Sequence, residues 1–330
     1  MKNLSKVLGA VFLLGAGAAS HANESISLTL NWTPTADHSP LYYARAQGWY
    51  KEAGIDLDIE SGKGSAVSAQ RVGSGGSTMG ISDLPTAMQA RGKGADLTAL
   101  MVIYANSPQG FYWLKSSGIK GAKDFPGHKI GNPPGDAARL MWPAFAKKVG
   151  IDPVAVTFVN VSPPAKVAAL KSKSVDIVSD FYNEHDLKVR EFGPDLAFLP
   201  WREIGVNLYG NAFTVNSAWL AGHKEVAAKF VAITQRAYAS CVKTFDPCLQ
   251  ALMASVSGLD ANNQRDQWNR IKTLMRDDTT EKVALGAFDA ARVKSDYALV
   301  QSLIGIDKPF DPATMFTNQF LDTKVKMSAN

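Results

Sequence analysis

The stretch that decides the fold is SISLTLNWTPTADHSPLYYARAQGWYKEAGIDLDI, residues 25–59. It opens with apolar residues at every second position, a pattern typical of a strand with one buried face. A polar loop over residues 31–40 follows. Within it, Ser39 is predicted to cap a helix and Pro40 to occupy its first position, where a missing N–H costs nothing. A glycine ends the helix and a second alternating run follows, so the order of elements predicts an α/β unit with parallel strands.

A second unit with the same order of elements lies between His128 and Asp180. It is predicted to contain a strand, a loop with a helix, a strand, a second helix and a final strand. The two units end in similar motifs, Ile81-Ser82-Asp83 and Val178-Ser179-Asp180. Two similar α/β units of similar length predict two related lobes, each with a mostly parallel sheet flanked by helices.

The C-terminal part of the chain, after about Val215, is predicted to be helical, because its apolar residues recur every three to four positions. Such a tail must bury its apolar faces, and a lobe that is already formed is the natural support. We therefore expect lobe one to comprise residues 23–112 and 209–330, the second part being mostly helical, and lobe two to comprise residues 113–208. Two crossings between the lobes predict a hinge and a cleft.

Residues 1–22 have the features of a cleaved export signal. Lys2 and Lys6 flank the start of an apolar run, and Ser20-His21-Ala22 supplies a small-residue cleavage site. The apolar run is shorter than the roughly 20 residues that span a bilayer. We therefore expect cleavage after Ala22 and a mature protein outside the cytoplasm.

The chain has two cysteines, Cys241 and Cys248. In an oxidising compartment such a nearby pair is expected to form a disulfide, with two separate buried thiols as the alternative. Their spacing does not match the common zinc motifs, and no histidine lies close to them. The sequence therefore favours a disulfide over a metal site.

The charge pattern does not indicate a nucleic-acid partner. The formal net charge is +5, and the basic residues are scattered without a cluster or interleaved aromatic residues. The sequence has no G-x-S-x-G, H-E-x-x-H or P-loop motif. We expect no metal and no cofactor. His38 beside Asp37 suggests a general base, but adjacent residues usually point in different directions, so an exported enzyme using His38 is the less favoured alternative.

Five predicted loops end where a helix begins: 35–40, 63–66, 82–84, 135–137 and 180–185. Ligands bind at strand-end loops in open α/β sheets, and helix N-termini present free N–H groups. Trp32, Phe181 and Tyr182 have the chemistry to stack on a flat ring, with core packing as the alternative for Trp32. Carboxylates suited to accept hydrogen bonds from amino groups are Asp37, Asp83, Asp180 and Glu184, and the loops also carry Ser65, Gly135 and Asp136.

Residues 30–59 and 62–94, together with VNLYGNAFTVNSAWL at 206–220, resemble the periplasmic solute-binding proteins of the thiamine-pyrimidine-precursor group. These belong to the wider set that serves ABC importers of nitrate, sulfonates and taurine. The resemblance implies a type II periplasmic binding protein fold with a helical C-terminal tail on lobe one. It also implies a monomer that closes on its ligand and delivers it to an ABC permease in the inner membrane.

The resemblance also implies roles for single residues. A tryptophan of the first loop and a tyrosine and glutamate of the second lobe hold the aminopyrimidine in such proteins, and they match Trp32, Tyr182 and Glu184. Asp37-His38 matches the polar pair of the first loop, and Gly135-Asp136 matches a second-lobe loop. The family also includes a pyrimidine synthase with a cysteine cluster, which this chain lacks. We expect a receptor for a flat nitrogen heterocycle, with alkanesulfonate, nitrate or an aromatic acid as alternative ligands.

Overall fold

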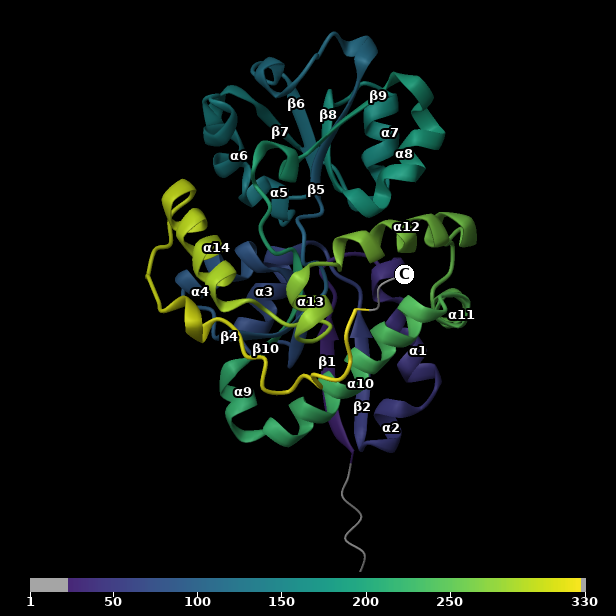
Figure 1. The fold of residues 1–330 in the computed structure, drawn as a ribbon. Coiled ribbons are helices and arrows are strands. Elements are labelled where there is room, and N and C mark those ends of the chain that lie inside the picture. Colours follow the sequence, from purple (N-terminus) through teal and green to yellow (C-terminus); the bar gives the residue numbers. More distant parts are fainter. Residues whose placement is uncertain (1–22, 328–330) are drawn as a thin grey trace, which may run out of the picture.

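The computed structural model describes residues 23–327, which form two α/β lobes, each built on a five-stranded sheet (Figure 1). The predicted export signal, residues 1–22, lies outside the described residues. The first sheet has the order β2-β1-β3-β10-β4. Its strands are β1 (Glu24–Thr29), β2 (Ile55–Glu60), β3 (Met79–Asp83), β4 (Leu97–Val102) and β10 (Asn211–Asn216).

The second sheet repeats this arrangement with the order β7-β6-β8-β5-β9. Its strands are β5 (Gln109–Leu114), β6 (Lys129–Asn132), β7 (Thr157–Asn160), β8 (Ile177–Phe181) and β9 (Leu196–Pro200). In each sheet the fourth strand, β10 or β5, runs antiparallel to both neighbours, while the other paired strands are parallel. The predicted α/β fold with mostly parallel sheets is therefore confirmed.

The chain changes sheets through the two antiparallel strands. β5 is the first strand of the second sheet, and β10 is the first strand after the return to the first sheet. Because all of β5 pairs within the second sheet, the first crossing precedes Gln109 and lies a few residues before the expected boundary at Trp113. The return precedes Asn211, where β10 begins.

In each of the two α/β units, helices flank the sheet (Figure 1). In lobe one they are α1 (Ser39–Ala46), α2 (Trp49–Glu52), α3 (Ser65–Gly73) and α4 (Leu84–Gly92), preceded by the short 3-10 helix η1 (Ala36–His38). In lobe two they are α5 (Ala137–Leu140), α6 (Trp142–Val149), α7 (Lys166–Lys171) and α8 (His185–Phe192), with η6 (Tyr182–Glu184) before α8.

The rest of the chain forms α9 (Ser217–Gly222), α10 (Lys224–Lys243), α11 (Asp246–Ser255), α12 (Ala261–Leu274), α13 (Asp278–Lys282) and α14 (Ala290–Leu303). Phe230 on α10 and Trp268 on α12 belong to the same buried cluster as Ile26 and Leu28 of β1. α12 also contacts η6 and α8, so it lies between the lobes (Figure 1). The tail thus packs on lobe one and reaches lobe two.

The start of α1 differs from the prediction. Pro40 lies in the first turn as expected, but the Ser39 hydroxyl donates to the Ala36 carbonyl at 2.7 Å and caps no N–H group. The reason is that η1 makes the chain helical before Ser39, whose φ and ψ are −55° and −33°. The loop therefore enters α1 through a continuous helical turn.

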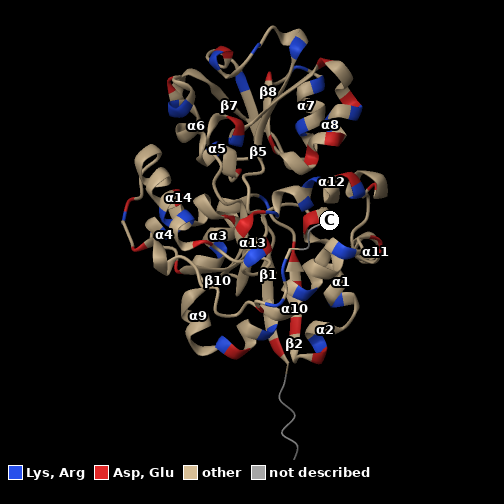
Figure 2. Cartoon of the chain, in the orientation of Figure 1, with Lys and Arg blue, Asp and Glu red and all other residues tan. Residues whose placement is uncertain are grey.

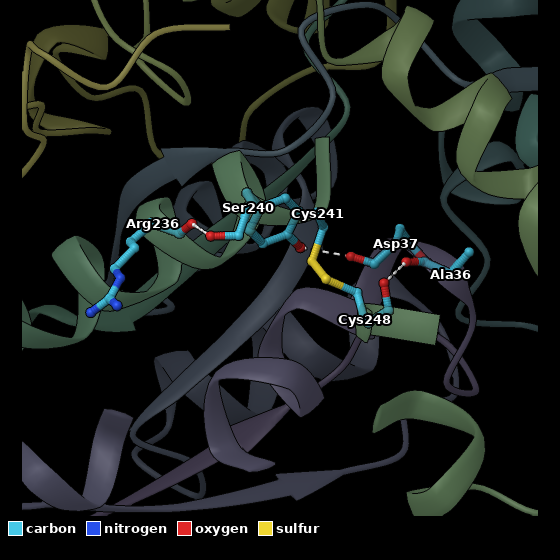
Figure 3. Close-up of a disulfide and its surroundings, with 8 residues drawn as sticks. Ala36, Asp37, Arg236, Ser240, Cys241 and Cys248 are labelled. Atoms are coloured by element: carbon cyan, nitrogen blue, oxygen red, sulfur yellow. Dashed lines mark hydrogen bonds between the residues drawn. A yellow bond between two sulfur atoms is a disulfide. The ribbon is translucent and has the colours of Figure 1, made fainter. Parts of the chain in front are cut away.

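The predicted disulfide is present. Cys241 on α10 and Cys248 on α11 are bonded, with a Cα–Cα distance of 5.9 Å, and both are buried. One turn before Cys241, the Tyr238 hydroxyl donates to the Asp37 carbonyl at 2.7 Å. The disulfide therefore lies beside the turn that carries Ala36 and Asp37 (Figure 3).

Candidate ligand-binding site

A small, narrow cavity lies where the loops of the two lobes meet. Four of the five predicted loops contribute to its wall. The lining residues are Asn31, Trp32, Thr35, Asp37 and Ser65 from lobe one, and Asp136, Ala137, Lys166, Asp180, Phe181, Asn183 and Glu184 from lobe two.

The structure brings six of the ten predicted site residues to this cavity: Trp32, Asp37, Ser65, Asp136, Asp180 and Glu184. The other four, His38, Asp83, Gly135 and Tyr182, do not line it. Each of these four has a structural explanation.

His38 is fully buried and supports the first loop. Its Nδ1 accepts a hydrogen bond from the Thr35 N–H at 3.1 Å, so the proton of the neutral ring is on Nε2, which donates to Asn31 Oδ1 at 3.0 Å. Burial lowers the pKa of His38, although the nearby Asp37 opposes this effect. The 3.3 Å approach of Nδ1 to Asp37 Oδ1 is therefore no ion pair. His38 positions Asn31 and Thr35, which do line the cavity.

Asp83 and Gly135 contact residues at the start of α3, next to the cavity, but do not line it. Asp83 caps α4 by accepting from the Thr86 N–H, and burial raises the pKa of its carboxyl to about 7, while the hydrogen bonds from Thr86 lower it. The Asp83 N–H donates to Ser65 Oγ at 3.1 Å. The Gly135 carbonyl accepts from the Ala66 N–H of lobe one at 3.3 Å and so joins the lobes.

Tyr182 was expected to stack on the ligand, and its ring instead lies outside the cavity. Arg202 and Arg270 lie over the ring at 4.5 and 4.6 Å from its centroid, and Arg270 donates to its hydroxyl. The preceding residue, Phe181, lines the cavity in its place. β8 ends at Phe181 and η6 begins at Tyr182, and of these two aromatic residues only Phe181 lines the cavity.

The residue that sequence reasoning missed most clearly is Lys166. Its side chain is 2% exposed, and its ammonium contacts Asp136 Oδ2 at 3.0 Å, the Ser179 carbonyl at 2.7 Å and Asp180 Oδ1 at 3.7 Å. It also lies 4.6 Å from the centroid of the Trp32 ring. Burial alone would lower the pKa of Lys166, but Asp136 and Asp180 raise it above its usual value. The Lys166 ammonium therefore already lies beside the Trp32 ring, on which the ligand ring was predicted to stack.

The internal repeat contains a signal for Lys166. β7 and β2 hold equivalent places in their sheets, and the helices that follow them are α7 and α3. Lys166 is the first residue of α7 and Ser65 is the first residue of α3. Ser65 was predicted and lines the cavity, so its equivalent in lobe two was a candidate as well. The sequence does not single out Asn183, Ala137 or Thr35 as ligand contacts, apart from their positions in the predicted loops.

Asp180 is held between two ammonium groups. Burial alone would raise its pKa, but Lys166 and Lys188 lower the pKa of Asp180 below its usual value, and Lys188 Nζ donates to Oδ2 at 2.6 Å. Glu184 differs, because within residues 23–327 its carboxyl accepts a single side-chain hydrogen bond, from Gln267 Nε2 at 3.1 Å. Burial and, next, the charge of Asp180 raise the pKa of Glu184 to about 7. The wall thus contains both paired and unpaired carboxyl groups.

Two features are absent from residues 23–327. No helix in this part of the chain is long and apolar enough to cross a membrane. Within the same residues, no three side chains of histidine, cysteine, aspartate or glutamate are grouped as metal ligands. Acidic and basic residues are interspersed over both lobes (Figure 2).

Two α/β lobes with a cavity between them define the periplasmic binding protein fold. A protein from Bordetella bronchiseptica RB50 matches with a TM-score of 0.75 and 19% identity, covering 90% of this chain and 95% of that one. The alkanesulfonate-binding protein SsuA from Xanthomonas axonopodis pv. citri matches with a TM-score of 0.68 and 14% identity, covering 90% and 100%. At these identities the likeness establishes the fold.

The chain belongs to the NMT1/THI5 like family, whose model matches residues 35–246. It is 29% identical over 142 residues to the 4-amino-5-hydroxymethyl-2-methylpyrimidine phosphate synthase THI5 of Saccharomyces cerevisiae, covering 42% of this chain and 41% of the synthase. The match thus spans about two fifths of that relative. A formylaminopyrimidine-binding protein from Halalkalibacterium halodurans is 22% identical over 259 residues, covering 77% of this chain and 78% of the relative. The riboflavin-binding protein RibY of Chloroflexus aurantiacus is 22% identical over 308 residues, covering 90% and 86%.

Proposed function

We propose that the protein is the extracytoplasmic solute-binding component of an ABC importer. It binds a small, flat nitrogen heterocycle between its lobes, with a thiamine pyrimidine precursor as the expected ligand. The observation that carries this proposal is the chemistry of the cavity wall, where both lobes supply carboxyl groups beside the aromatic rings of Trp32 and Phe181.

The charge of the wall favours ligands rich in N–H donors. Its ionisable groups are the carboxyls of Asp37, Asp136, Asp180 and Glu184 and the ammonium of Lys166. A sulfonate, nitrate or carboxylate would therefore meet a wall with more acids than bases, in a setting where charges are poorly screened. Amino groups and protonated ring nitrogens are matched by carboxylate acceptors. This charge pattern supports a heterocycle over an alkanesulfonate as the proposed ligand.

Two relatives support the same ligand class, because formylaminopyrimidine and riboflavin are both flat nitrogen heterocycles. The rings of Trp32 and Phe181 provide apolar surface for such a ring, with Lys166 at one side of Trp32. In the proposed importer the protein is periplasmic, acts as a monomer, closes on its ligand and docks on an inner-membrane permease.

The proposal includes no catalytic step. The alternative of an exported enzyme depended on His38, whose two ring nitrogens are both engaged within the first loop and which does not line the cavity. A general base needs to reach the proton that it removes, directly or through one water. His38 is therefore a positioning residue for the loop.

A thermal-shift panel of aminopyrimidines, other heterocycles, alkanesulfonates and nitrate tests the proposal. Since a ligand that binds only the folded state raises its stability, we expect the melting temperature to rise with aminopyrimidine concentration. A rise with sulfonate or nitrate, and none with any heterocycle, contradicts the proposal.

A further inference from the structure

Two carboxyl groups face the cavity from opposite lobes without a cation partner among the described residues. Asp37 is 2% exposed and belongs to η1 of lobe one, whereas Glu184 belongs to η6 of lobe two. Asp37 Oδ1 accepts from the Thr35 hydroxyl at 2.6 Å, and Glu184 Oε1 accepts from the Gln267 amide at 3.1 Å. Both hydrogen-bond donors are neutral, and so is the neighbouring His38 ring. Within the described residues, neither Asp37 nor Glu184 therefore forms an ion pair with a lysine or arginine.

The other two carboxyl groups of the cavity wall, those of Asp136 and Asp180, form ion pairs with lysines. Asp136 and Asp180 both contact the ammonium of Lys166, and Asp180 also contacts that of Lys188. The structure therefore divides the four carboxyls into one pair that binds internal cations and one pair that does not. The unpaired groups, Asp37 and Glu184, are the ones contributed by different lobes.

An independent observation points to a ligand at the same place. Asn183, next to Glu184, is 4% exposed and lines the cavity, and its side-chain oxygen Oδ1 has no hydrogen-bond partner in the described part of the chain. A buried carbonyl oxygen without a donor is costly, so such a group in a cavity indicates a missing donor. Asn183 therefore adds a third acceptor beside the two free carboxyls.

We propose that the protein binds its heterocycle as a cation, whose positive charge is held between Asp37 and Glu184. The inference rests on the proposed function and names the charge state of the ligand. Closure of the lobes brings the two carboxylates to one cavity, which is unfavourable unless a positive charge or a proton lies there. A cationic ring satisfies both carboxylates in the closed form, so the ligand's charge contributes to closure.

The charged groups around Glu184 allow the same site to accept a neutral base. Asp180 on β8 and Asp37 on η1 raise the pKa of Glu184, Lys188 on α8 and Lys166 on α7 lower it, and burial brings it to about 7. α12 contributes the neutral amide of Gln267. In the closed form without ligand the Glu184 carboxyl therefore takes up a proton as the pH falls through about 7. An aminopyrimidine or aminopyridine accepts this proton at its ring nitrogen, which leaves a cationic ring beside a carboxylate.

The test compares 4-aminopyridine, which is protonated at neutral pH, with aniline, which is neutral and has nearly the same shape. Calorimetry at pH 8 is carried out on the wild type, Glu184→Gln and Asp37→Asn. Glu191→Gln serves as the matched control, because Glu191 lies on α8 and pairs with Lys171 at the surface. We expect the wild type and Glu191→Gln to bind 4-aminopyridine about tenfold or more tightly than aniline, and each cavity variant to lose most of this preference.

Equal binding of the two rings by the wild type, or a preference that survives both cavity substitutions, overturns the inference. Binding of neutral heterocycles with no gain from charge overturns it as well, while the proposed function stands. If no heterocycle binds at all, both fail. The two cavity variants act on different lobes, so a folding defect in one leaves the other as a test, and the wild-type comparison needs neither.

Discussion

Arg270 on α12 donates to both carboxylate oxygens of Asp186 on α8, with Nε–Oδ2 and Nη2–Oδ1 distances of 2.7 Å. Because α12 packs on lobe one and α8 belongs to lobe two, this pair joins the lobes. Arg270 also donates to the Tyr182 hydroxyl, and Gln267 on the same helix reaches Glu184 in the cavity wall. In the described conformation α12 thus holds the two lobes together beside the cavity wall.

Replacing Arg270 by alanine is expected to weaken ligand affinity by about tenfold, because a bidentate, charge-assisted pair that exists only in the closed form is lost. Calorimetry measures the affinity, and small-angle scattering should show a larger radius for the variant. Arg265→Ala is the matched control, since Arg265 lies on the same helix and pairs with Asp246 of lobe one at the surface. Equal losses in both variants contradict a role for Arg270 in closure.

Gly135→Ala tests whether the backbone contact between the lobes matters. A Cβ at Gly135 would lie 3.0 Å from Val67 Cγ2 and 3.2 Å from the Lys63 carbonyl, both in lobe one. We expect affinity to fall about threefold to tenfold with little change in melting temperature, because overpacking here opposes closure only. Gly121→Ala is the control, because nothing lies within 4 Å of its added carbon. An unchanged affinity for Gly135→Ala would show that the lobes do not need this contact.

Lys166→Met is expected to destabilise the protein by about 3 kcal/mol, because it leaves Asp136 and Asp180 without their shared buried cation. Denaturant unfolding at pH 7 measures the change. Lys171→Met removes a lysine from the same helix whose ammonium is exposed, and its effect should be small. A fully stable Lys166→Met variant would contradict the assignment of Lys166 as the counter-ion of these two acids.

Reduction of the Cys241–Cys248 disulfide is expected to lower the free energy of unfolding by about 2 kcal/mol, since the closed loop is short. Urea unfolding with and without dithiothreitol measures this. The Cys241→Ser/Cys248→Ser variant should show the lower stability in both conditions. If the reductant changes nothing in the wild type, the disulfide does not stabilise the fold.

Glu184→Gln should stabilise the ligand-free protein more at pH 8 than at pH 4. The folded pKa of about 7 lies above the ordinary value of 4.5, so between these values the folded state binds more protons than the unfolded state. The wild type therefore loses stability as pH rises through this window, and glutamine removes that loss. The measurement is the difference in melting temperature between variant and wild type at both pH values. A difference that shrinks as pH rises contradicts the raised pKa.

Much of the fold is predictable from residue periodicity. The alternation at Ile26 and Leu28 and the repeat of loop motifs at Asp83 and Asp180 identify the strands and two of the strand-end loops. The chain crosses to lobe two a few residues before the predicted boundary at Trp113. The boundary was misplaced because β5 is buried on both faces, so apolar and polar residues do not alternate along it. A strand buried on both faces has no period of two to mark its ends.

The side chains of the site were harder to predict, because their directions depend on distant parts of the chain. Tyr182 is held by Arg270, 88 positions later, and this contact turns its ring away from the cavity. His38 is engaged locally by Asn31 and Thr35, a pattern that its dipeptide with Asp37 does not reveal. Lys166 was missed because a lysine in a first helical turn is usually solvated, and only the folded arrangement places two carboxylates around it.

The measurement that tests the central claim most directly is calorimetric titration of the wild type with 4-amino-5-hydroxymethyl-2-methylpyrimidine and, in parallel, with the sulfonate MOPS. An acidic wall with aromatic rings predicts saturable binding of one pyrimidine per chain and no saturable binding of MOPS. Binding of the sulfonate without binding of the pyrimidine would contradict the account.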